Sequence, residues 1–325
     1  MRRESLRSLA ARSAYAGRAV LVTGAAGAFG SATLRLLRYL GADAIGIDRV
    51  PGAGIVTCDV TDDEQVRAAV AEAVERLGRL DTLIHYAGVG PVADVGQSPD
   101  AEVREALEVN LLGPWRVTAA ALPALLDTSG RVIVTASLLA GVTMPFSAAY
   151  TVSKRALTAY ADVLRAEYGT HLGVTTVYPG YVHTPIHDRS RAAGVALDGL
   201  VPAESVRDTV LTVVRAGAER TAPRDVASTR AGTAALLLAR HSPGLLDRAL
   251  AARLRHLVRA RQFDDADLAV GLRQRHGAIP RHGVFQGHGA FQGHGVFQEH
   301  GVIQRNNVRP ASPPGPRVAP EMGGR

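Results

Sequence analysis

Short apolar runs alternate with amphipathic stretches over the first two thirds of the chain. The apolar runs have the length of strands buried on both faces, and they lie at residues 18–23, 44–47, 54–60, 81–88, 131–137 and 173–180. The stretches between them have the period of helices packed on a sheet, and they lie at residues 31–43, 62–77, 101–126, 149–168 and 203–217. This alternation predicts a doubly wound α/β fold, a parallel sheet covered by helices on both faces, in a single domain.

The pattern changes after residue 180. Residues 181–200 are predicted to form a loop after the last apolar run, and we interpret their histidines, His183 and His187, as surface residues. Residues 219–228, ERTAPRDVAS, lack an apolar run, so no seventh strand is predicted there. Residues 233–262 predict two helices. The second of these, within 244–262, carries an apolar stripe beside arginines, which favours packing on its own domain or a partner subunit over peripheral contact with an anionic membrane.

Residues 276–305 are five hexads that each begin with His-Gly. Hexapeptide repeats can build a β-helix, and regular histidines can bind a transition metal loosely, but so short a run cannot bury a core by stacking. We favour a flexible low-complexity tail that continues, rich in Pro and Gly, to the end of the chain. The domain organisation predicted from these patterns is a lead at 1–17, an α/β domain at 18–228, a helical extension at 229–275 and a tail at 276–325.

Composition narrows the classes of function. The net charge of +7 is compatible with a nucleic-acid partner, but the arginines are spread along the chain, so we expect none. Cys58 is the only cysteine, which excludes an internal disulfide and is typical of a cytoplasmic protein. No apolar run approaches the roughly 18–20 residues of a membrane span, and no continuous apolar stretch near the N-terminus indicates a signal peptide.

The turn after the first predicted strand carries the first chemical signal. Residues 24–30 read GAAGAFG and lead directly into a helix. Glycines let the backbone turn tightly and approach a pyrophosphate, and the helix N-terminus offers free N–H groups and a positive dipole end. The turn therefore predicts a Rossmann-type dinucleotide site. A phosphate site for another ligand and a plain strand–helix turn are the alternatives.

Asp48 bears on which dinucleotide is bound. It ends the second predicted strand, 21 residues after Gly27. An acid there accepts both ribose hydroxyls of an adenosine and repels a 2′-phosphate, so NAD is favoured over NADP. Arg49 would be the residue that turns toward a 2′-phosphate, which keeps NADP open. A helix cap or a turn is the alternative role for Asp48.

Three side chains have the types that carbonyl reduction needs. Tyr150 and Lys154 lie one helical turn apart, and Ser137 ends a predicted strand. Hydride transfer to a carbonyl leaves an alkoxide, and a tyrosine can protonate it only if its pKa of about 10 falls toward neutral, which a nearby ammonium favours. Alone, such a pair is usually a solvated helix face. However, Lys154 is the only lysine among 37 basic residues, which indicates that position 154 is functionally constrained.

Together these motifs resemble the short-chain dehydrogenase/reductase superfamily, classical branch, over roughly residues 18–217. The resemblance rests on the glycine turn, on Asn110, on the spacing from Ser137 through Tyr150 to Lys154, and on Pro179-Gly180. It implies Tyr150 as general acid/base, Lys154 as its electrostatic partner and ribose ligand, Ser137 as the donor that orients the carbonyl, and Asn110 in a proton relay. No metal is expected in this site. The cofactor-binding residues predicted from the strand ends and the resemblance are Gly24, Gly27, Phe29, Gly30, Asp48, Asp59, Val60, Ala87, Gly88, Tyr150, Lys154, Pro179 and Gly180.

The sequence departs from the family's pattern in two places. Ala28 stands where the classical glycine pattern has glycine, and the spacing also fits the extended branch, which includes sugar epimerases. The usual Asn-Asn-Ala-Gly run is here His85-Tyr86-Ala87-Gly88, without the asparagines that brace the sheet. We expect an NAD(H)-dependent oxidoreductase acting on a secondary alcohol or ketone, as a homodimer or homotetramer. A dinucleotide-binding regulatory protein without catalysis and an extended-type epimerase are the alternatives.

Overall fold

The computed structural model of the protein describes residues 14–195 and 202–275, so the hexads and the tail lie outside the described residues. Its centre is a seven-stranded sheet in which every neighbouring pair is parallel, with the order β3-β2-β1-β4-β5-β6-β9. The predicted doubly wound sheet is thereby confirmed. Its strands are β1 (Ala19–Thr23), β2 (Asp43–Asp48), β3 (Ile55–Thr57), β4 (Thr82–His85), β5 (Arg131–Thr135), β6 (Gly173–Tyr178) and β9 (Asp225–Ala227).

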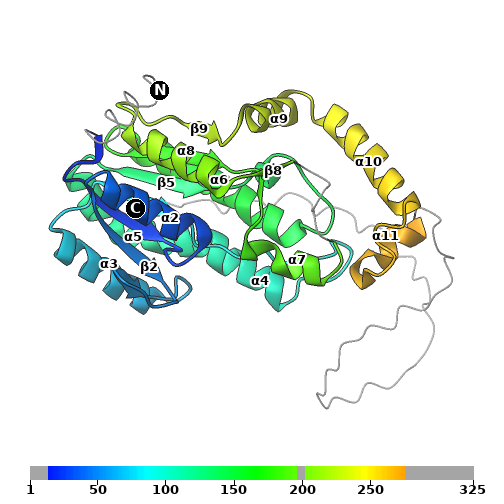
Figure 1. Cartoon of the computed structure of the whole chain (residues 1–325), viewed down its shortest axis with the longest axis horizontal. Coiled ribbons are helices and arrows are strands. Elements are labelled where there is room, and N and C mark those ends of the chain that lie inside the picture. Colours follow the sequence, from blue (N-terminus) through cyan, green and yellow to red (C-terminus); the bar gives the residue numbers. More distant parts are fainter. Residues whose placement is uncertain (1–13, 196–201, 276–325) are drawn as a thin grey trace, which may run out of the picture. The chain divides into compact units, whose positions relative to one another are not determined.

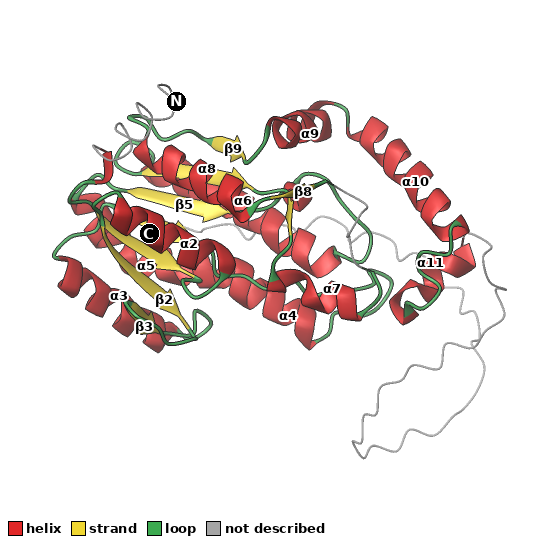
Figure 2. Ribbon diagram, in the orientation of Figure 1, coloured by secondary structure: helices red, strands yellow, loops and turns green. Residues whose placement is uncertain are grey.

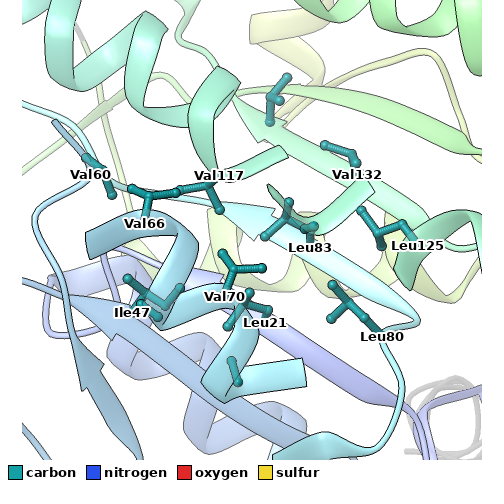
Figure 3. Close-up of a cluster of buried hydrophobic side chains, with 14 of the residues drawn as sticks. Leu21, Ile47, Val60, Val66, Val70, Leu80, Leu83, Val117, Leu125 and Val132 are labelled. Carbon is teal, nitrogen blue, oxygen red and sulfur yellow. The ribbon is translucent and has the colours of Figure 1, made fainter. Parts of the chain in front are cut away.

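Helices cover both faces of the sheet (Figures 1 and 2). On one face lie α3 (Asp63–Leu77), α5 (Gly113–Asp127) and α6 (Ala148–Tyr168), and on the other lie α2 (Ala28–Tyr39) and α8 (Val206–Ala218). Figure 3 shows the core on the first face, where Leu83 and Val132 of the sheet meet side chains of α3 and α5. Each fully buried Leu or Val of such a core contributes about 1.5–3 kcal/mol.

The order of the strands in the sheet determines where a ligand cleft can form. The chain passes outward from β1 through β2 to β3, then returns to pair β4 on the other side of β1. At such a reversal the connections after β1 and β4 leave in opposite directions, which opens a crevice beyond the carboxyl ends of the strands. The glycine turn follows β1 and the His85–Gly88 run begins at the end of β4, so both lie at this crevice.

The expectation that no strand follows residue 217 is wrong. Residues 225–227 form β9, which pairs in parallel with β6 from Thr176 to Tyr178. The strand is only three residues long and lies at the sheet's edge, where none of its residues is fully buried. A strand with a solvated side needs no continuous apolar run, and this is why the hydrophobic pattern did not indicate it.

The lead and the extension both pack on the described fold. Tyr15, in the predicted lead, is fully buried in the core beside α2 and α8, and its hydroxyl donates to the Val214 carbonyl at 3.0 Å. The two helices predicted in the extension are present as α9 (Arg230–His241) and α10 (Pro243–Arg259). A 3-10 turn, η4 (Asp267–Ala269), and α11 (Val270–Arg275) follow. No helix among the described residues is both long and apolar enough to span a membrane.

Shorter elements surround the cleft. Between β4 and α5 lie α4 (Ala101–Leu107) and a π-helical turn, η1 (Glu108–Leu112). After β5 comes η2 (Leu138–Ala140). After β6 come β7 (Tyr181–Val182), η3 (Pro185–His187) and α7 (Asp188–Ala192), and β7 pairs with β8 (Ala203–Glu204) in a separate two-stranded sheet. We call residues 183–195 the lid segment.

Candidate active site

Two glycines of the turn after β1 are required by close backbone packing. Gly24 has a φ of +66°, and a Cβ there would lie 2.5 Å from the Ala87 nitrogen. A Cβ on Gly30 would overlap the Gly24 carbonyl. Ala28, by contrast, begins α2 in ordinary helical geometry and borders the cleft. The turn therefore brings backbone to the cleft as a phosphate site requires, and the methyl of Ala28 is accommodated without strain.

The two residues that replace the family's asparagines make braces of their own. His85 is buried in β4, and its Nε2 lies 2.9 Å from the Thr118 hydroxyl on α5. The Tyr86 hydroxyl lies 2.9 Å from that of Thr33 on α2. Burial lowers the pKa of His85 to about 3, with a smaller contribution from the charge of Lys154, so the imidazole is neutral. The end of β4 is thus tied to the helices on both faces of the sheet.

Asp48 faces the glycine turn from the end of β2. One carboxylate oxygen accepts from the Ala26 nitrogen and the other from the Val50 nitrogen, both at 2.9 Å. Part of the side chain remains exposed to the cleft. These bonds fix the carboxylate at the cleft's edge and leave further oxygen lone pairs for a ligand's hydroxyls. Arg49, exposed, borders the same cleft.

Ser137, Tyr150 and Lys154 meet on the other side of the cleft. Ser137 follows β5 and caps η2, with its oxygen accepting from the Leu139 nitrogen at 3.1 Å. Tyr150 and Lys154 extend from the first turns of α6, and the Lys154 Nζ lies 5.8 Å from the centre of the Tyr150 ring. Lys154 is only 4% exposed, and its ammonium donates to the Thr135 carbonyl at 2.9 Å.

Burial shifts both titratable groups of this cluster. It raises the pKa of Tyr150 to about 12, against a smaller lowering by the hydrogen bond with Ser137. Burial lowers the pKa of Lys154 to about 8. At neutral pH the tyrosine therefore holds its proton and the lysine its charge. In the protein alone the pKa of the tyrosine is therefore not brought toward neutral, because the burial of its hydroxyl dominates.

Asn110 lies behind the cleft and not in its wall. It is fully buried in the π-helical turn. Its amide exchanges two hydrogen bonds with the backbone of Val89, at 2.8 and 2.9 Å, and donates a third to the Ser153 hydroxyl at 2.9 Å. A Cβ on Gly88 would lie 3.1 Å from the Asn110 amide oxygen and 3.4 Å from the Lys154 Nζ. Asn110 thus joins the segment after β4 to α6 beside Lys154.

These groups surround one cleft of about 550 Å³. The three side chains expected to do the chemistry line it. The other predicted residues that line it are Gly24, Gly27, Phe29, Gly30, Asp48, Gly88, Pro179 and Gly180. Four predicted residues are not in its wall: Asp59, Val60, Ala87 and Asn110. Asp59 accepts from Thr61, whereas Val60 is buried against the start of α5, where a Cβ on Gly113 would lie 2.8 Å from it.

A family model described as short chain dehydrogenase matches residues 18–194, more than half of the chain. The chain belongs to the short-chain dehydrogenase family. This assignment confirms the predicted family and the predicted Rossmann-type fold. It also confirms that the protein is an oxidoreductase whose cofactor is a nicotinamide dinucleotide.

Similar proteins agree with this assignment. Bovine L-fucose dehydrogenase is 32% identical over 194 residues, which are 55% of this chain and 71% of that protein. Dehydrogenase/reductase SDR family member 7B of Xenopus laevis is 32% identical over 219 residues, 64% of this chain and 67% of that protein. A solved short chain dehydrogenase from Burkholderia cenocepacia, in complex with NADP, is 27% identical with a TM-score of 0.62, and covers 73% of this chain and 98% of its own. Thermoplasma acidophilum aldohexose dehydrogenase, at 20% identity over 66% of this chain and 92% of its own, shares the fold with a TM-score of 0.59.

The lid segment of this short-chain dehydrogenase brings residues to the cleft that the sequence alone did not indicate. Thr184, Ile186 and Arg189 line it. Arg189 binds both carboxylate oxygens of Glu105, at 2.7 and 3.3 Å, and so ties α7 to α4. His183 is exposed, as expected, but His187 lines the cleft and packs on the Tyr181 ring at 4.6 Å. In the sequence, only the position of the lid segment after the Pro179-Gly180 turn indicated that its residues could reach the cleft. The segment is irregular, so its contacts leave no periodic pattern in the sequence.

Proposed function

We propose that this protein is an NAD(H)-dependent oxidoreductase that transfers a hydride between a nicotinamide ring and the carbon of a secondary alcohol or ketone. One observation carries the proposal: Ser137, Tyr150 and Lys154 line the same cleft as the glycine turn and Asp48. A proton donor, a fixed positive charge and a hydroxyl donor at one end of a dinucleotide cleft are the groups that carbonyl reduction needs.

The residues of the cleft fit the cofactor. The close backbone packing at Gly24 and Gly30 leaves N–H groups at the start of α2 for the pyrophosphate. Asp48 would hold the adenosine ribose, and its charge supports NAD over NADP. Lys154 would hold the nicotinamide ribose, as the family resemblance implies. When bound, the nicotinamide supplies or accepts the hydride.

The side chains of the cleft would then stabilise the charge that develops on the substrate oxygen and supply its proton. In ketone reduction, the Ser137 hydroxyl donates a hydrogen bond to the substrate oxygen. Tyr150 donates its proton to that oxygen as negative charge develops on it, and a pKa of about 12 keeps the proton available at neutral pH. Lys154, charged below a pKa of about 8, stabilises the phenolate that remains. Alcohol oxidation runs the same steps in reverse.

Three alternatives bear on this proposal. A binding protein without catalysis was suggested by His85 and Tyr86, but both have hydrogen-bond partners that brace the cleft, so they give no sign of a decayed site. A sugar as substrate is supported by the relative named L-fucose dehydrogenase, since it shares about a third of its residues with this chain over the aligned part. The extended-type epimerase rests on glycine spacing alone.

Assembly through α5 and α6 is part of the proposal. Trp115, Val152 and Val163 on these two helices are each more than half exposed. The Trp115 ring also stacks against Tyr160, with centroids 5.0 Å apart. An exposed apolar surface of this kind supports a homodimer or homotetramer that buries it. Light scattering of the protein and of Trp115→Glu tests this, and an unchanged mass in the variant would contradict it.

The decisive experiment combines cofactor binding with turnover. Fluorescence titration should give a lower Kd for NADH than for NADPH, and Asp48→Ala should narrow that difference. Absorbance of the reduced nicotinamide should then reveal turnover in a panel of secondary alcohols and ketones, and Ser137→Ala should reduce it. Tighter binding of NADPH would show that Arg49 outweighs Asp48. Tight binding with no turnover across the panel would favour the binding protein.

A further inference from the structure

A second, smaller hollow continues from the cleft past Tyr150. Its volume is about 40 Å³, and it shares Leu139, Tyr150 and Ile186 with the cleft wall. A group attached to the reacting carbon of a substrate at Tyr150 would therefore enter it. Most of its lining is apolar, and these residues are Pro91, Val92, Leu139, Pro145, Phe146, Ile186 and Val195.

Besides Tyr150, the polar side chains that line this hollow are His187, Ser147 and Ser190. The His187 ring packs against the Tyr181 ring, and both serine hydroxyls already have partners. The Ser147 hydroxyl donates to the Met144 carbonyl at 2.6 Å and also lies 3.0 Å from the Thr151 hydroxyl. The Ser190 hydroxyl donates to the His187 carbonyl at 2.8 Å. Neither has a proton left for a ligand. A substrate with several hydroxyl groups here would face mainly carbon, and unpaired polar groups are costly to bury.

The C-terminal extension supports the wall of this hollow from behind. Val195, at the end of the lid segment, is buried in a cluster with Leu257 and Val258 at the end of α10 and with residues of the turn that follows. On the other wall, the Phe146 ring meets Phe263 edge to face, with centroids 5.7 Å apart.

Phe146 is held in place at both its backbone and its ring. Its φ of +60° is one that a bulky residue seldom adopts. Its carbonyl accepts from the Ala93 nitrogen at 2.9 Å, which fixes the backbone. Phe263 fixes the ring. A residue held in so unfavourable a conformation indicates that the position of its ring matters to the site.

We propose that the substrate carries a compact apolar group of a few carbon atoms next to its reacting carbon, and that Phe263 sets the size of that group through Phe146. The inference rests on the proposed function and makes it more specific, because it favours an apolar ketone or alcohol over a sugar. Pockets of this kind discriminate by size over about 10–200-fold per methylene, whereas polar groups facing carbon are rejected for lack of partners.

The test uses the full chain and measures ligand binding separately from turnover. Cyclohexanone, 4-ethylcyclohexanone and L-fucose are titrated against the protein without cofactor by saturation-transfer NMR. We expect cyclohexanone to bind at least about tenfold more tightly than L-fucose. Equal or tighter binding of L-fucose overturns the inference.

Phe263→Ala then tests the size control, with Leu245→Ala as the matched control, because Leu245 is 58% exposed on α10. We expect Phe263→Ala to weaken cyclohexanone binding several-fold and to strengthen binding of 4-ethylcyclohexanone, a reversal that a general loss of structure would not produce. If Phe263→Ala unfolds at a much lower temperature than the wild type, Phe263→Leu replaces it. This variant keeps the contact with Phe146 apolar, and its two affinities should lie between those of the wild type and those expected for Phe263→Ala. If Phe263→Ala leaves both affinities as Leu245→Ala does, Phe263 has no such role.

Turnover separates failure of the inference from failure of the proposed function. Oxidation of L-fucose without activity on apolar alcohols would keep the oxidoreductase and overturn the apolar substrate. Absence of turnover, together with selective binding of cyclohexanone, would overturn the proposed function and keep the apolar hollow.

Discussion

The cleft and the C-terminal extension of this protein are stabilised by different kinds of interaction. The cleft is lined by backbone groups, a buried cation and hydroxyls, and hydrogen bonds at defined distances hold Asp48, Ser137 and Lys154 in it. The extension meets the lid segment through an apolar cluster around Phe263. The family match ends at residue 194, before the extension begins. Directional bonds fix a chemical geometry, whereas apolar packing sets shape and tolerates volume-conserving change.

This difference suggests a division of labour between the reaction and the choice of substrate. A change in the cleft should reduce turnover of every substrate and leave their ranking unchanged. A change in the extension should alter the ranking and leave the chemical step intact. Each variant below is chosen to break or to sharpen that contrast.

The largest effect is expected from Tyr150→Phe. The ring keeps its packing, but the proton donor is lost, and general acid catalysis of this kind contributes about 10²–10⁴-fold. We expect turnover of all substrates to fall by about a thousandfold while NADH binding changes little. Steady-state turnover and fluorescence titration measure the two separately. Residual activity within tenfold of the wild type would contradict the assignment of Tyr150.

Lys154→Arg should have the next largest effect. The guanidinium keeps the charge but is wider and planar, and Lys154 is buried among the Thr135 carbonyl, Asn110 and Gly88. A misplacement of about 1 Å can cost on the order of a hundredfold in rate. The control is Arg35→Lys on the exposed side of α2, which should leave turnover unchanged. Near-normal turnover of Lys154→Arg would make the solitary lysine an accident of composition.

The pH dependence should follow the buried lysine. Lys154 is charged below its pKa of about 8 and neutral above it. Since its charge stabilises the Tyr150 phenolate, kcat/KM for ketone reduction should be level from pH 6 to 7.5 and fall about tenfold per pH unit well above 8. A profile measured with a saturating cofactor and a limiting ketone tests this. In Lys154→Arg the falling limb should move to higher pH, and a wild-type profile that stays level to pH 9.5 would contradict the role of the charge.

A smaller effect is expected in the extension. Leu257, buried at the end of α10 against the lid segment, loses that contact in Leu257→Ala. We expect KM for an apolar ketone to rise several-fold, with kcat within about twofold, because the lid segment is less firmly held. The exposed Leu245→Ala is again the control. If kcat falls by the same factor as kcat/KM, the extension contributes to the chemical step. That result would contradict the separation between a cleft that sets the reaction and an extension that sets the choice of substrate.

The sequence predicted the cleft better than it predicted the substrate pocket, for a physical reason. The glycine turn, Asp48 and the Ser137–Lys154 spacing depend on local geometry at strand ends and along one helix, which a linear pattern contains. The apolar hollow depends on Val195 meeting Leu257, more than sixty residues away in the chain, across an irregular segment. No periodicity encodes such a contact.

The misses within the fold have the same origin. The edge strand β9 needed no apolar run, because its neighbour β6 supplies the pairing and solvent covers its other side. Tyr15 joined the core from the predicted lead by packing beside α2 and α8, and its hydroxyl also binds the Val214 carbonyl. The braces of His85 and Tyr86 were hidden because Thr118 and Thr33 lie on other elements. In each case the partner is set by the tertiary fold.

The smallest effect is expected from truncation after Arg275, which removes the hexads and the tail but leaves α11 and the apolar cluster complete. Every residue that lines the cleft or the smaller hollow among the described residues lies between Gly24 and Val195. The support behind the hollow ends at Leu272. Five hexads are too few to bury a core of their own, so the described fold should not depend on them. Turnover, the ranking of substrates and the melting temperature should therefore match those of the full chain, with rates within about twofold. Precipitation or loss of cofactor binding in the truncated protein would show that the hexads pack on the catalytic domain, and the contrast would then lie between the cleft and a longer C-terminal region.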